Sequence, residues 1–114
     1  MPSARVEHDG RVLAGQVAIA SSMWARARGL LGRSELARGE ALVLPKTKQV
    51  HTVGMTFPID VLFLDENGRV LHLVRAMRPW RLSRWVRRCR NVIELQAGAA
   101  ADVKRGDRVE IKSP

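Results

Sequence analysis

The segment 57–65 places the tightest limit on the fold, because apolar side chains occupy both of its alternating faces. One face carries Ile59, Val61 and Phe63, and the other carries Leu62 and Leu64. Successive side chains of a β-strand point to opposite sides of the sheet, so a strand with two apolar faces must have protein on both sides. We therefore predict an interior strand here, in a fold built around a sheet.

A tight turn follows this strand directly. Glu66-Asn67-Gly68 is a favoured hairpin sequence and leads into 70–74, so the two segments predict an antiparallel hairpin. Asp9-Gly10 predicts a second hairpin near the start of the chain. In all, short apolar or alternating runs that end at turn residues predict further strands at 4–7, 11–20, 41–45, 91–95 and 108–111.

Helical signals are fewer. Apolar residues recur at helical spacing over 22–31, between serines that can cap the start and a glycine that can end the helix. The alanine-rich stretch 98–102 allows a helical turn, and 76–90 has no sustained period, which indicates a long ordered crossing. A chain of 114 residues fits one domain, over 1–114. We therefore predict an α+β fold that is mostly β.

Composition excludes several classes of protein. No apolar run reaches the roughly 20 residues that span a bilayer, and no signal sequence is visible, so we expect a cytoplasmic protein with no membrane partner. Cys89 is the single cysteine, which excludes an internal disulfide and a cysteine-based zinc site. His8, His51 and His72 have no short ligand spacing and no clustered Asp or Glu, so we expect neither a metal nor another cofactor.

Positive charge is concentrated in one part of the chain. The formal net charge is +9, from 20 Lys and Arg against 11 Asp and Glu, and no acidic residue lies between Glu66 and Glu94. Eight arginines fall in that interval: Arg69, Arg75, Arg78, Arg81, Arg84, Arg87, Arg88 and Arg90. Such a surface attracts phosphates or acidic partners by long-range steering. The alternative is that the chain is simply rich in arginine and that these side chains only solvate a loop.

The segment 50–60 holds the candidate chemistry. If it folds back at its centre, His51 faces Asp60 across a hairpin. Asp60 lies on an apolar strand face and needs a partner, which His51, Thr52 or a backbone amide could supply. The pair then either holds the hairpin together or lets His51 act as a proton acceptor or ligand-binding group. Cys89 could complete a nucleophilic triad with them, although a lone cysteine beside a strand is usually packing.

The same residues carry a resemblance. Val50-His51-Thr52, Met55 and the run from Phe57 to Asp65, followed by Gly68 and Val70, resemble the core signature of the uncharacterised protein family 0127, a domain family of unknown function. The flanks agree: Arg28-Gly29-Leu30-Leu31-Gly32, Pro79-Trp80-Arg81, Val92-Ile93-Glu94-Leu95, Ala97-Gly98 and Gly106-Asp107. The resemblance covers about residues 10–112 and implies a compact α+β fold with a curved, barrel-like sheet, but no established activity. Many members have a cysteine four residues before the motif histidine, where this chain has Thr47.

The leading hypothesis is a non-enzymatic module that binds an anionic small molecule or acidic partner in a groove between the His51 region and 75–90. The candidate binding residues are His51, Thr52, Met55, Asp60, Arg78, Trp80, Arg81 and Trp85. One alternative is a hydrolase-type enzyme that uses His51 with Asp60. Another is non-specific binding of single-stranded nucleic acid, in which tryptophans stack on bases and arginines contact phosphates. An extended polyproline-like path would align the arginines, which recur every three residues, along one edge.

Overall fold

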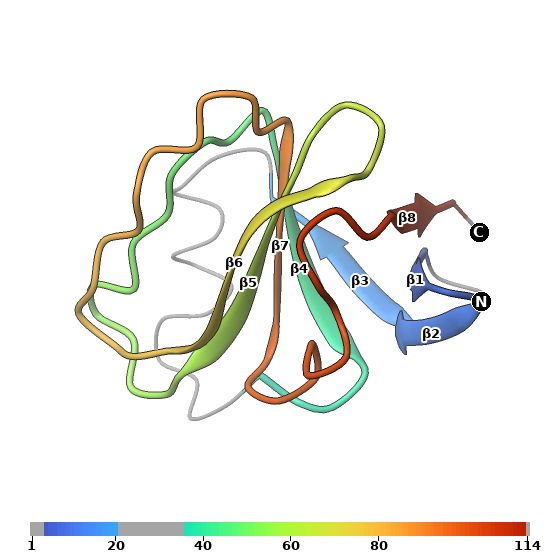
Figure 1. Ribbon diagram of the computed structural model, residues 1–114. Helices are drawn as coiled ribbons and strands as arrows, with labels where there is room; N and C mark the ends of the chain where they lie inside the picture. The colour runs from blue at the N-terminus through green and yellow to red at the C-terminus, as the bar shows by residue number, and fades with distance from the viewer. Residues whose placement is uncertain (1–3, 21–35, 114) are drawn as a thin grey trace.

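The computed structural model describes residues 4–20 and 36–113, whose strands form two sheets (Figure 1). The strands are β1 (Arg5–His8), β2 (Arg11–Ala14), β3 (Gln16–Ile19), β4 (Glu40–Pro45), β5 (Ile59–Leu64), β6 (Val70–Met77), β7 (Asn91–Gln96) and β8 (Val109–Lys112). One sheet has the order β2-β1-β8 and the other β3-β4-β7-β5-β6. All pairs are antiparallel except β3 with β4.

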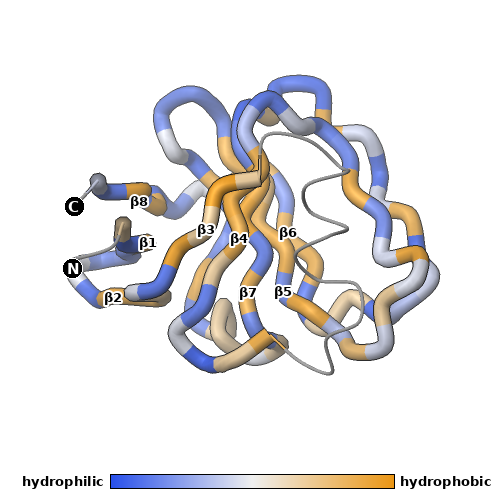
Figure 2. The backbone as a smooth tube through the Cα atoms, turned by 180° about the vertical axis from the view of Figure 1, so that it is seen from behind, coloured by the Kyte–Doolittle hydropathy of each residue, from blue (hydrophilic) through white to orange (hydrophobic). Residues whose placement is uncertain are grey.

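Strand β5 is an interior strand, as its sequence predicts. It pairs with β6 on one side and with β7 on the other, and all six of its residues are buried. The two alternating faces enter different apolar clusters: Ile59, Val61 and Phe63 lie in one, and Leu62 and Leu64 in the other. Figure 2 shows the matching pattern, with hydrophobic residues concentrated on β4, β5 and β7. The prediction of protein on both sides of this strand is confirmed.

The turn after β5 is also confirmed. Gly68 has φ +80°, a left-handed conformation that glycine adopts without steric cost. The side chain of Asp65 accepts hydrogen bonds from the amides of Asn67 (2.8 Å) and Arg69 (2.9 Å), which closes the turn. The hairpin at Asp9-Gly10 forms as well, joining β1 to β2. The predicted strand 11–20 is divided at Gly15, however, and its two halves join different sheets.

The α+β prediction is wrong for the part of the chain that the structure describes, which contains strands and turns but no helix. The helix predicted at 22–31 lies outside the described residues. The stretch 98–102 forms successive turns, because its hydrogen bonds run to the third residue back and the amide of Ala100 donates to Asp60 instead of continuing a helical ladder. The barrel implied by the resemblance is not closed either: within 4–20 and 36–113, no pairing joins edge strands β3 and β6. None of the described elements is a helix that could cross a membrane.

Candidate functional site

A long segment without regular strand structure, residues 78–90, runs along the outer side of the molecule and is called the crossing segment below. It lies antiparallel beside residues 48–52, and Figure 1 shows the two segments side by side at the end away from the termini. The amide of Ser83 donates to the carbonyl of Val50 (2.9 Å), and the amide of Val86 donates to that of Lys48 (2.8 Å). The predicted ordered crossing is therefore anchored by main-chain hydrogen bonds.

Thr52 fixes the start of the crossing segment. It is completely buried, and its hydroxyl donates to the carbonyl of Arg78 (2.6 Å) while accepting from the amide of Arg81 (2.9 Å). Its main chain donates to the carbonyl of Arg81 and accepts from the amide of Trp80, both at 2.9 Å. These four hydrogen bonds bring together four of the residues predicted for the site, with Thr52 in a positioning role.

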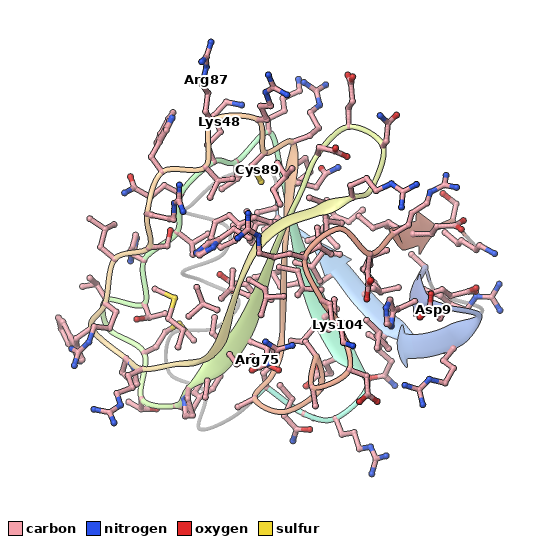
Figure 3. All side chains as sticks on the ribbon, viewed as in Figure 1. Asp9, Lys48, Arg75, Arg87, Cys89 and Lys104 are labelled. Atoms are coloured by element: carbon pink, nitrogen blue, oxygen red, sulfur yellow. The ribbon has the colours of Figure 1, made fainter. Side chains whose placement is uncertain are left out.

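The crossing segment has a three-residue burial pattern. Ser83, Val86 and Cys89 are buried, and the two residues between successive members of this series are exposed. The predicted polyproline-like path is nevertheless interrupted, because turns occur at 79–80 and 87–88, so the pattern belongs to an irregular chain. It turns the arginines and tryptophans outward, and Figure 3 shows Arg87 extending into solvent while Cys89 lies inside.

A groove of about 370 Å³ separates the crossing segment from strand β6. The β6 side contributes His72, Val74, Ala76 and Met77. The crossing segment contributes Arg78, Arg81, Leu82, Ser83 and Arg84. Three arginines at a three-residue spacing therefore meet in one groove, and no carboxylate is among the described residues that line it.

His72 reports the electrostatics of this groove. Burial is the main cause that lowers its pKa, and the positive charges of Arg84 and Arg105 lower it further. The imidazole ring also packs against Phe63, with ring centroids 5.3 Å apart. The groove thus combines a neutral histidine with several guanidinium groups, which together present hydrogen-bond donors and positive charge to an anion.

Asp60 does not face His51, so the predicted hairpin register is wrong. Asp60 is buried in β5 opposite Leu95, and its carboxylate accepts three main-chain hydrogen bonds. The donors are the amides of Ala76 (2.8 Å), Gly98 (3.0 Å) and Ala100 (2.9 Å). Backbone amides were one of the partners considered for this carboxylate, and they are the partners observed.

His51 lies beside the crossing segment. It forms an antiparallel bridge with Leu82, and its Nδ1 accepts a hydrogen bond from the amide of Val53 (3.2 Å). No hydrogen bond connects it to Asp60 among the residues that the structure describes, so the geometry does not assemble the proposed hydrolase pair. Met55 is buried in the core at 2% exposure, away from the groove lining.

Cys89 is a buried residue that packs in the core and does not have the features of a nucleophile. Its thiol lies near the carbonyl of Asn91 (3.3 Å), and burial raises the thiol pKa to about 11. Reactive cysteines have a depressed pKa and partial exposure. The Cys89–His51–Asp60 triad therefore has no support in the geometry.

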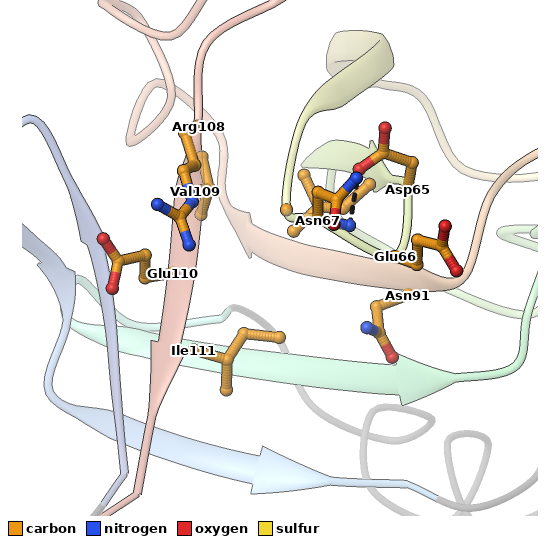
Figure 4. Close-up of a pocket in the computed structure, with 10 residues that line it drawn as sticks. Asp65, Glu66, Asn67, Asn91, Arg108, Val109, Glu110 and Ile111 are labelled. Atoms are coloured by element: carbon orange, nitrogen blue, oxygen red, sulfur yellow. Dashed lines mark hydrogen bonds between the residues drawn. The ribbon is translucent and has the colours of Figure 1, made fainter.

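Two other features deserve comparison with the groove. A hollow of about 260 Å³ beside the β5–β6 turn is lined by Asp65, Glu66, Arg108 and Glu110 among others, so its charges are mixed (Figure 4).

The second feature is a contact that sequence spacing did not reveal: His8 lies 2.8 Å from Asp107 and 3.4 Å from Asp9. The expectation that no carboxylate clusters with His8 is wrong, but the His8–Asp107 distance is that of a hydrogen bond and needs no metal.

Comparison with known proteins places the chain in a family. The model of the DUF192 family, described as "Uncharacterized ACR", matches residues 4–111. The chain belongs to this uncharacterised family, also called UPF0127. A UPF0127 protein of Pyrococcus horikoshii is 33% identical over 84% of this chain and 87% of its own length. One from Thermococcus sibiricus is 37% identical over 63% of this chain, and the match spans about half (49%) of that relative.

Solved structures share the fold of this DUF192 chain. A Novosphingobium aromaticivorans protein of unknown function superposes with a TM-score of 0.77 at 23% identity, covering 95% of this chain and 83% of that one. A Sinorhizobium meliloti protein, described as a candidate transcription regulator, gives a TM-score of 0.74 at 24% identity, with coverage of 96% and 92%. At these identities the likeness concerns the fold alone.

Of the binding residues predicted from the sequence, Arg78 and Arg81 line this groove. The others do not: His51, Thr52, Met55, Asp60, Trp80 and Trp85. His72, Val74 and Arg84 line the groove without having been predicted as site residues. His72 and Val74 share one face of the predicted strand 70–74, but the opposite wall of the groove could not be predicted without the path of the crossing segment.

Proposed function

We propose that this protein is a binding module for an anionic ligand, and that the groove between β6 and the crossing segment is its site. The observation that carries the proposal is the convergence of Arg78, Arg81 and Arg84 in a groove whose described lining residues include no carboxylate. Like charges held close together repel, and a bound anion relieves that repulsion. Guanidinium groups also form paired hydrogen bonds with phosphate and carboxylate oxygens.

The other lining residues favour an anion that also has an apolar part. Val74 and Leu82 line the groove beside the arginines, and Leu82 is 68% exposed. His72 can donate or accept one further hydrogen bond in its neutral form. The ligand class is thus a small organic phosphate or carboxylate, or an acidic side chain of a partner protein.

Thermal unfolding in the presence of anions tests the proposal. Inorganic phosphate, pyrophosphate and an acidic peptide at millimolar concentration are expected to raise the unfolding midpoint, because a ligand that binds only the native state stabilises it. Arg84→Gln should reduce that rise. Arg108→Gln is the matched control, since it removes the same charge from an exposed residue outside the groove.

The pKa of His72 gives a second readout at the site itself. A bound anion offsets the charge of Arg84, so phosphate should raise the pKa of His72 in an NMR titration of its imidazole protons. If phosphate leaves the His72 titration unchanged and stabilises Arg84→Gln as much as Arg108→Gln, the groove is not the site.

A further inference from the structure

The outer side of the crossing segment carries a cluster of exposed apolar side chains, defined here as the apolar tip. It consists of Trp80 (65% exposed), Leu82 (68%), Trp85 (60%) and Val53 (46%). Val53 is close to them in space because the carbonyl of its neighbour Thr52 accepts a hydrogen bond from the amide of Trp80 (2.9 Å). Among the described residues only Val12 and Ile19 are other large apolar side chains with comparable exposure. Grouped exposure of this kind marks an interaction surface.

The tip has a fixed main chain. Trp80 has φ +62°, a left-handed conformation that bulky residues rarely adopt and that surrounding structure must enforce. The hydrogen bonds from Trp80 and Arg81 to the buried Thr52 provide that enforcement. The fold thus holds the main chain of Trp80 in an unfavourable conformation while leaving most of the residue exposed to water.

Exposed cationic side chains alternate with the apolar tip residues along the crossing segment. Arg81, Arg84, Arg87 and Arg88 are exposed on the same segment, and no acidic residue occurs from 67 to 93. Figure 3 shows Arg87 extending into solvent, whereas the ammonium of Lys48 donates hydrogen bonds to the carbonyls of Arg87 and Cys89 (both 2.9 Å). Tryptophan prefers the boundary between lipid headgroups and acyl chains, and arginine beside it can bind headgroup phosphates.

We propose that the apolar tip docks on the surface of an anionic lipid bilayer. The aliphatic members favour lipid over nucleic acid, because Leu82 and Val53 cannot stack on a base but can bury in the outer acyl region. The proposal departs from the expectation of no membrane partner, which rested on the absence of a spanning segment. It shares Leu82 with the groove but rests on Trp80, Trp85 and Val53, which are not among the groove's lining residues.

Co-sedimentation with vesicles tests the proposal. The full chain should bind phosphatidylcholine vesicles containing phosphatidylserine, and should bind pure phosphatidylcholine vesicles much less. Bound protein should show a blue shift of tryptophan fluorescence. The double variant Trp80→Ala/Trp85→Ala should lose about tenfold or more in affinity, because burial of each indole contributes to partitioning. Val12→Ala/Ile19→Ala is the matched control, since it removes exposed apolar side chains elsewhere.

A charge series separates the electrostatic part. Arg87→Gln/Arg88→Gln should weaken binding by about fivefold for each arginine that contacts the anionic surface, whereas Arg108→Gln should not. Unfolding midpoints confirm that each variant is folded, and Leu82→Ala/Trp85→Ala replaces the double tryptophan variant if Trp80→Ala destabilises the turn.

Two results would overturn the proposal. One is equal binding to anionic vesicles by the wild type, Trp80→Ala/Trp85→Ala and Leu82→Ala/Trp85→Ala. The other is absence of vesicle binding, including the case in which single-stranded RNA binds through the same tryptophans. Failure of the groove proposal looks different, because phosphate then has no effect on His72 while vesicle binding persists. Conversely, the double tryptophan variant should keep its response to phosphate.

Discussion

The carboxylate of Asp60 accepts a hydrogen bond of 2.8 Å from the amide of Ala76, at the point where strand β6 bulges. Ala76 has φ +50° and lines the groove. The other carboxylate oxygen accepts the amides of Gly98 and Ala100, in the turns after β7. A single buried side chain therefore ties the end of the groove wall to a loop distant in sequence, and Asp60 acts as a positioning residue for the groove.

Replacement of Asp60 should be strongly destabilising. Asp60→Ala leaves three amide donors without an acceptor, so we expect a loss of about 3–5 kcal/mol in the free energy of unfolding. Asp60→Asn should lose less, about 1–3 kcal/mol, because its amide oxygen still accepts while its NH₂ group faces an amide donor. Urea unfolding monitored by circular dichroism gives both values. Small and equal losses would show that these hydrogen bonds contribute little in solution.

The error about Asp60 shows which information the sequence contained. Burial of Asp60 followed from its apolar neighbours on β5, because the alternation of a strand is a local property. Its partners were not local. His51 pairs with Leu82, and Asp60 binds amides 16 to 40 positions away, whereas the predicted hairpin assumed the shortest connection. Local pairing rules do not determine such contacts.

The groove, too, could be predicted from the sequence only in part. The three-residue recurrence of arginine predicted charges along one edge of an extended crossing. Arg78, Arg81 and Arg84 do line one groove, but turns at 79–80 and 87–88 interrupt the extended path. The position of His72 on the facing wall could not be predicted in this way. It depends on the hydrogen bonds of Thr52, which direct the crossing segment back past β6. The alanine-rich 98–102 failed as a helix prediction because Asp60, remote in sequence, captures the amide of Ala100. Helix propensity alone could not anticipate that competitor.

Removing the Thr52 hydroxyl should loosen the start of the crossing segment. Thr52→Val keeps the shape of the side chain but leaves the amide of Arg81 and the carbonyl of Arg78 without their partner, so we expect a loss of about 1–3 kcal/mol. Thr52→Ser keeps the hydroxyl and should lose less. Chemical unfolding measures stability, and hydrogen exchange at Arg81 measures the local effect. Equal stability of the valine and serine variants would argue against this role.

Stability should depend on the protonation of His72. Its pKa in the folded protein lies below the ordinary value of 6.5, so below about pH 6.5 the unfolded chain binds more protons than the native one. The free energy of unfolding should therefore fall as the pH is lowered through this range. The contribution of neutral His72 should be present in full above it. His72→Gln should flatten that part of the profile, and Arg84→Gln should flatten it partially. Unfolding midpoints from pH 5 to pH 8 test this; an unchanged slope in His72→Gln would refute it.

Cys89 should be inert in the folded protein. With a thiol pKa of about 11, about one thiol in a thousand is ionised at pH 8, and the side chain is also buried. Reaction with a disulfide reagent at pH 8 should be slow in buffer and rapid in concentrated urea. Cys89→Ala should keep any anion or vesicle binding. Fast stoichiometric labelling of the native protein would instead require the thiol to be accessible and activated.

The glycine at the β5–β6 turn should be irreplaceable for a reason beyond its backbone angle. A Cβ at Gly68 would lie 2.5 Å from the carbonyl oxygen of Val109, so the main chain of β8 would have to move. Gly106 provides the control, because its φ of +89° is similar but a Cβ there meets nothing within 4 Å. We expect Gly106→Ala to lose about 1–2 kcal/mol through conformational strain alone.

Gly68→Ala should exceed that loss by at least about 1 kcal/mol, since the clash adds to the strain and displaces the hydrogen bond from the amide of Val109 to the carbonyl of Gly68 (2.8 Å). Urea unfolding of the two variants gives the difference directly, and hydrogen exchange at Val109 locates it. If both alanine variants lose the same free energy, the turn yields without disturbing β8. The close approach would then place no demand on the residue at position 68, and only its left-handed conformation would remain as a reason for glycine.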